Sequence, residues 1–98
     1  MDTKNAIRVA LSKEPEMNEE LKHTLSLVNE KSECDVVLDF SKAGVITSAS
    51  LSLLLKLKTL QKESGQRLLL CKVPKVTRKI LVATGIDGLF EFADDKAS

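Results

Sequence analysis

The pattern of apolar and polar positions divides the 98-residue chain into alternating strands and helices. Short runs rich in apolar and β-branched residues predict strands. These strands cover residues 6–12, 34–40 and 67–73, and a short last strand follows a turn within residues 86–92. Apolar residues at helical spacing predict three helices between the strands. The helices cover residues 17–31, the segment from the hydroxyl-rich stretch near residue 47 to the glycine at 65, and residues 75–84.

The alternation of strands and helices predicts an α/β fold. We expect a small single-layer, mostly parallel sheet of about four strands, flanked by three to four helices. Residues 1–98 form one domain with a polar C-terminal tail at 93–98. The continuous apolar run at 34–40 is typical of a strand covered on both faces. Functional residues of such sheets usually lie outside the carboxyl ends of the strands, which is where the segment after Phe40 is expected.

That segment begins the second predicted helix with an unusual number of hydroxyl residues. The sequence VITSASLSLLLKLKTL, residues 45–60, contains Thr47, Ser48, Ser50 and Ser52 within six positions. A helix needs only one side chain as its N-cap, and Thr47 or Ser48 is expected to serve. A phosphate on Ser48 would meet unpaired backbone N–H groups and the positive end of the helix dipole.

The leucines of the same helix divide into two sets. One set falls within an arc of roughly 120°, wide enough to face the sheet. It comprises Leu53, Leu54, Leu57 and Leu60. Leu51 and Leu55 lie outside this arc, on the side of Lys58 and Lys62 and close to Ser48. They are either covered by a neighbouring element or form an apolar docking patch with a polar switch at its rim.

Composition excludes several classes of function. A net charge of +1 and the absence of Trp and Tyr argue against a nucleic-acid-binding surface. No apolar run approaches the ~20 residues that span a bilayer, and no signal peptide is evident, so we expect a cytoplasmic protein. Two cysteines without ligand spacing predict no metal site, and we expect both thiols to be buried. His23 is predicted on an exposed helix face, and no catalytic constellation or Gly-rich loop indicates an enzyme or a cofactor.

Residues 34–92 resemble the STAS domain of anti-sigma factor antagonists, with a weaker match at 6–12. The pattern V-x-x-x-I-L-x-x-T-G-I-x-G-L-F, residues 76–90, resembles the family's last helix and its glycine ending. The family signature D-S-S/T-G-L at the helix start falls here on Thr47, Ser48, Ala49, Ser50 and Leu51. Thr47 replaces the Asp and Ser50 the Gly, and SKEPE stands in place of the family's G-x-L-D before the first helix. Asp39 is then the acidic residue expected near the serine.

The resemblance implies a non-enzymatic regulator that switches partners. Ser48 would be the phosphorylation site. Its neighbourhood would comprise Asp39, Thr47, Ala49 and Ser50, and the partner would bind Leu51, Leu55 and Lys58. Expected partners are an anti-sigma factor or GHKL-type serine kinase and a PP2C-type phosphatase, with no nucleic acid and no membrane insertion. The alternative is a constitutive STAS scaffold or transporter-associated subunit without a phospho-switch.

Overall fold

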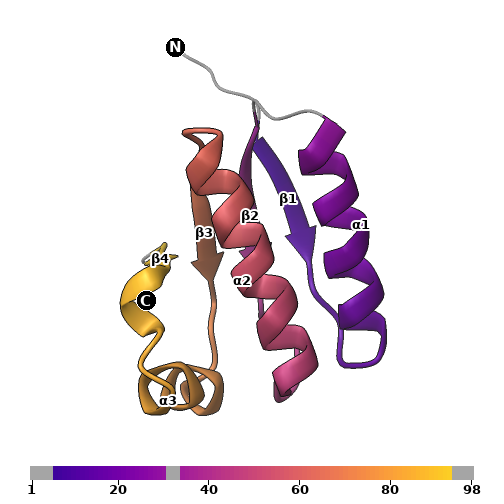
Figure 1. The fold of residues 1–98 in the computed structure, drawn as a ribbon. Coiled ribbons are helices and arrows are strands. Elements are labelled where there is room, and N and C mark those ends of the chain that lie inside the picture. The colour runs from indigo at the N-terminus through magenta and orange to yellow at the C-terminus, as the bar shows by residue number, and fades with distance from the viewer. Residues whose placement is uncertain (1–5, 31–33, 94–98) are drawn as a thin grey trace.

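A computed structural model describes residues 6–30 and 34–93 of the chain (Figure 1). The elements are β1 Ala6–Ala10, α1 Glu16–Glu30, β2 Asp35–Asp39, α2 Ser48–Glu63, β3 Leu68–Cys71, α3 Lys75–Ala83, a 3₁₀ turn η1 Asp87–Leu89 and β4 Glu91–Phe92. The predicted order of strands and helices is confirmed. The predicted tail lies outside the described residues from position 94 onward.

The strands form one four-stranded parallel sheet in the order β1-β2-β3-β4. This confirms the predicted α/β class. Each strand is added beside the preceding one, and right-handed crossovers in a single direction place the connecting helices on the same face. Figure 1 shows α1 and α2 side by side over that face, both beginning at the carboxyl end of the strands. No helix among the described residues is long and apolar enough to cross a bilayer.

The core lies between this face of the sheet and the two long helices. Its side chains alternate along the strands and recur at helical spacing along α1 and α2. The most deeply buried include Met17, Leu21, Val36, Leu38, Leu54, Leu57 and Leu70, each 0% exposed. Removing one such side chain from water contributes about 1.5–3 kcal/mol, so this layer supplies most of the driving force for folding.

The opposite face of the sheet is less covered than the sequence predicted. Along β2 the burial alternates: Val36 and Leu38 are buried, and Val37 is only half-buried. Val37 and its neighbour Leu69 on β3 both lie outside the hydrophobic core cluster. The expectation that residues 34–40 are covered on both faces is therefore wrong, because the crossover helices α1 and α2 occupy one face only.

Helix α2 has the predicted boundaries but a shifted buried stripe. It is preceded by Thr47 and followed by Gly65, whose φ of +73° suits a glycine. The buried residues are Ser50, Leu54, Leu57 and Gln61, with Leu53 and Leu60 half-buried at the margin. Two of these side chains are polar. Gln61 Nε2 donates to the carbonyls of Cys34, at 2.9 Å, and Arg67, at 2.8 Å, whereas its Oε1 has no partner among the described residues.

Candidate functional site

The hydroxyl cluster lies at the carboxyl edge of the sheet, where α2 begins. The loop that joins β1 to α1 reaches the same edge and places Glu14 against the start of α2. Ser48 is the first residue of the helix and its side chain is exposed. Thr47 and Ser50, on either side of it, both contact the Glu14 carboxylate.

Thr47 occupies the predicted N-cap position without capping through its side chain. Its backbone is extended, with φ −113° and ψ 179°, and its hydroxyl makes no bond to an N–H of the first turn. The hydroxyl instead donates to Glu14, with Oγ1 2.9 Å from Oε2, and the Thr47 N–H donates to the same oxygen at 3.1 Å. The first turn of α2 also contains no acidic residue. The first backbone N–H groups of α2 are therefore capped neither by the Thr47 hydroxyl nor by an acidic side chain of the first turn.

Ser50 is the buried member of the cluster. It is 0% exposed, and its hydroxyl contacts Glu14 Oε2 and lies 2.7 Å from Asn18 Oδ1. A buried hydroxyl is stable only when it is hydrogen-bonded, and these two residues from the β1–α1 loop and α1 satisfy it. Ser50 therefore joins the start of α2 to the start of α1.

The charge of Glu14 is stabilised by the same bonds. Hydrogen bonds from Ser50 first, and then from Thr47, hold the pKa of Glu14 below its ordinary value, against the opposing effect of burial. Glu14 is thus a carboxylate at neutral pH. It adds one fixed negative charge beside Ser48, and α2 itself supplies none in this turn.

Asp39, the acidic residue predicted near the serine, has other partners in the structure. Its Oδ1 accepts the Ser41 N–H at 2.8 Å and its Oδ2 pairs with Arg8 at 3.1 Å. The Ser41 N–H is the main cause that lowers the pKa of Asp39, and Arg8 assists. Asp39 therefore closes the turn after β2, and Glu14 is the carboxylate that contacts the hydroxyl cluster.

The predicted partner-binding residues lie along one side of α2. Leu51 and Leu55 are half-buried and pack against the core with part of their surface open, and Lys58 is half-buried beside them. Val45, in the loop before the helix, is 57% exposed and adds apolar surface near Ser48. The side of α2 that carries Ser48, Leu51 and Leu55 is therefore accessible and partly apolar, as required of a docking surface.

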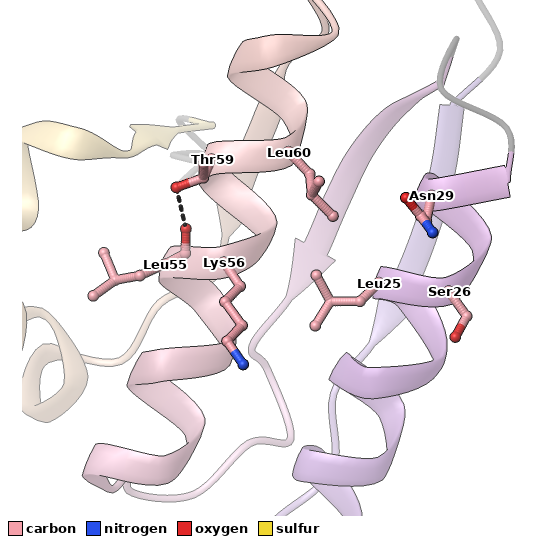
Figure 2. A pocket seen from close by; sticks show the side chains of 7 residues that line it. All are labelled: Leu25, Ser26, Asn29, Leu55, Lys56, Thr59 and Leu60. Atoms are coloured by element: carbon pink, nitrogen blue, oxygen red, sulfur yellow. Dashed lines mark hydrogen bonds between the residues drawn. The ribbon is translucent and has the colours of Figure 1, made fainter.

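A groove runs along the other side of α2, between this helix and α1. It has a volume of about 580 Å³ and is bordered by Leu25, Leu55, Lys56 and Leu60, among others. Figure 2 shows the side chains of Leu25 and Leu60 projecting toward each other across the groove, and that of Leu55 pointing away from α1. Leu55 thus belongs to the border of the groove, and its side chain extends toward the face of α2 that is turned away from α1.

The two cysteines and the single histidine of the chain all lie in described segments. No group of three or more His, Cys, Asp or Glu side chains in these segments could hold a metal ion. Cys34 and Cys71 are free and buried, as predicted, and His23 is exposed.

Comparison with known proteins identifies the family. Residues 3–91 match the family described as "Mlab, STAS domain". The chain belongs to the STAS domain family. The fold is similar to that of the anti-sigma factor antagonist SpoIIAA in its unphosphorylated form, with a TM-score of 0.71 and 16% identity over 96% of this chain and 84% of that one. No curated protein matches the sequence.

The sequence analysis of this STAS domain missed three residues of the site: Glu14, Asn18 and Val45. Glu14 belongs to the SKEPE segment that replaces the family's G-x-L-D. The signal that could have found it is positional. In a parallel sheet the loops after β1 and β2 meet at one edge, so an acidic residue in the first loop can contact the helix that follows the second.

Proposed function

We propose that this STAS domain is a non-enzymatic, protein-binding regulator of the anti-sigma factor antagonist kind, which exchanges partners when Ser48 is phosphorylated. The observation that supports this most directly is the contrast within the hydroxyl cluster. Thr47 and Ser50 are bonded to Glu14, and Ser48 between them is exposed on the first turn of α2. A kinase could therefore reach Ser48 without breaking the contacts that hold the helix.

Electrostatics explains why a phosphate here would affect a partner more than the domain. The N–H groups of the first turn and the helix dipole favour an added anion by about 0.3–1 kcal/mol at an exposed position. Glu14 opposes this with one negative charge nearby. A partner packed on Leu51 and Leu55 would instead lose a dry contact to a hydrated group with a charge of about −1.5 to −2. The expected result is release of the partner from a folded domain.

The proposed partners follow from the family. They are an anti-sigma factor or GHKL-type serine kinase, which binds the unphosphorylated domain through Leu51, Leu55 and Lys58, and a PP2C-type phosphatase that restores binding. The proposal assumes a cytoplasmic setting. Thr47, Ala49, Ser50 and the Glu14 carboxylate would shape the neighbourhood of the phosphate without carrying it, and Asp39 would act only through the turn after β2 that it closes.

The test combines phosphorylation with binding. A GHKL-type kinase with ATP should add one phosphate to the purified domain, located at Ser48 by mass spectrometry and absent from Ser48→Ala. Ser48→Asp should weaken binding of that kinase by about tenfold or more with little change in unfolding free energy, and the control Ser26→Asp, exposed on α1, should bind like the wild type. Phosphate at another residue, or equal binding of Ser48→Asp, would refute the switch.

One observation favours the alternative of a constitutive scaffold or transporter-associated subunit. The signature Asp of the family is Thr47 here, and its hydroxyl is bonded to Glu14. In that case Leu51→Glu should abolish partner binding, and Ser48→Ala and Ser48→Asp should both leave it unchanged. The same set of variants therefore separates the two functions.

A further inference from the structure

Strand β1 is an edge of the sheet. Among the described strands it pairs only with β2. Leu11, which continues β1, donates its N–H to the Asp39 carbonyl at 2.9 Å and so directs its backbone toward β2. Successive residues of a strand alternate in this direction. The N–H and C=O groups of Arg8 and Ala10 therefore point outward, and both residues are exposed.

A groove follows this outer edge. It has a volume of about 500 Å³, and its two walls are β1, residues 7–10, and the side of α1 that carries Glu19, Glu20, His23 and Leu27. A free strand edge beside a helix is the arrangement that accepts an added strand, because backbone bonds give affinity and the helix contacts alternate side chains.

The charges of the groove indicate what kind of strand it accepts. Glu20 accepts the N–H and hydroxyl of Ser12, both at 2.7 Å, which fixes its carboxylate on the α1 wall. Glu19 is exposed on the same wall and lies 3.6 Å from Lys22 of the same helix. Arg8 on the other wall is paired with Asp39 at 3.1 Å, which offsets its charge. The helix side of the groove thus has two carboxylates against one adjoining lysine, an excess of one negative charge, and the strand side contains outward-facing backbone groups.

We propose that an extended, basic segment of a partner protein binds this groove and adds a fifth strand beside β1. Lysine or arginine side chains at alternate positions would lie along the α1 wall with their stems on Leu27 and their charges near Glu19. Intervening side chains would lie beside Arg8 and Ala10. A second copy of this chain fits less well, because it would present another pair of acidic α1 walls at the same contact. This surface is separate from the proposed phosphorylation site.

The probe for this proposal is an end-capped eight-residue peptide of alternating lysine and threonine, with the glutamate–threonine peptide as control. Nuclear magnetic resonance should show slowed hydrogen exchange at the amides of Arg8 and Ala10 on adding the lysine peptide. Ala10→Pro removes an outward N–H and spares the bonds to β2, so it should fold and weaken binding by about tenfold, while Ala10→Ser binds normally. Glu19→Lys should weaken binding by about threefold or more.

Three outcomes would overturn the proposal. One is no protection of the two amides at 2 mM peptide, a concentration on the order of the weakest specific affinities. Another is equal binding of the glutamate peptide. The third is a dimer in sedimentation experiments that Ala10→Pro dissociates, which would assign the edge to a second copy. Ser48→Asp should not alter peptide binding, so failure here and failure of the phospho-switch are distinguishable.

Discussion

Replacement of Glu14 tests the contacts that hold the start of α2. The Glu14 carboxylate accepts hydrogen bonds from the Thr47 N–H, the Thr47 hydroxyl and the buried Ser50 hydroxyl. A hydrogen bond to a charged group contributes about 1.5–3 kcal/mol, and the two from exposed Thr47 count for less than that. Glu14→Ala should therefore lower the free energy of unfolding by about 2–3 kcal/mol. Glu14→Gln should cost about 1 kcal/mol, because an amide oxygen still accepts these bonds but more weakly.

The pH dependence distinguishes a charged acceptor from a neutral one. The pKa of Glu14 is lowered from its ordinary value of 4.5, mainly by the bond from Ser50. A carboxyl with a lowered pKa in the folded state contributes stability that is fully present above 4.5. That contribution is lost as the pH falls through the lowered value. The difference between wild type and Glu14→Gln should thus be constant from pH 7 to 5 and become progressively smaller as the pH falls below 4.5.

Urea unfolding followed by circular dichroism measures this difference at each pH. Asp39 also titrates in acid, but it is present in both proteins and cancels in the comparison. An equal difference at pH 7 and pH 3 would show that the charge of Glu14 contributes nothing. A Glu14→Ala variant as stable as the wild type would show that the cluster around Ser50 does not hold α2.

Two further substitutions test how the carboxyl end of α2 is fixed. Gln61→Leu removes the only side chain that donates to the buried Cys34 carbonyl among the described residues. It should lower the free energy of unfolding, measured by urea titration, by about 1–3 kcal/mol. No loss would show that water replaces the side chain at this carbonyl. Gly65→Ala should cost about 1–2 kcal/mol in thermal unfolding because its φ is +73°. Gly88→Ala, where a Cβ has open space, should change the unfolding temperature little. An equal loss of stability in Gly65→Ala and Gly88→Ala would contradict the argument from the positive φ of Gly65.

The local pattern of the sequence was sufficient to predict the strands and helices, but not which faces of the sheet are covered. Short apolar and β-branched runs located the strands, and apolar residues at helical spacing located the helices. Which face of a strand is covered depends on the order of strands and the handedness of the crossovers, neither of which the run at 34–40 encodes. Val37 is as apolar as Val36, yet only Val36 is fully buried.

The buried stripe of α2 was misplaced for a related reason. An arc chosen by apolar residues alone contained Leu53 and Leu60 and omitted Ser50 and Gln61. Those two polar residues are buried where other segments supply partners: Glu14 and Asn18 for the Ser50 hydroxyl, and the Cys34 and Arg67 carbonyls for the Gln61 amide nitrogen. Hydropathy describes a side chain in isolation, so it cannot register a partner that only the fold supplies.

The contacts of Glu14 also decide which hydroxyl is suited to a switch. A phosphate on Ser50 would place a dianion in a buried position against the Glu14 carboxylate, and the repulsion would separate α2 from the β1–α1 loop. A phosphate on Thr47 would break the bond that its hydroxyl donates to the same carboxylate. Ser48 lies between them with its side chain exposed. A charge there therefore affects a partner bound to α2 and breaks no contact within the domain. The network that fixes the neighbours is thus what makes one position free to change charge while the fold stays intact.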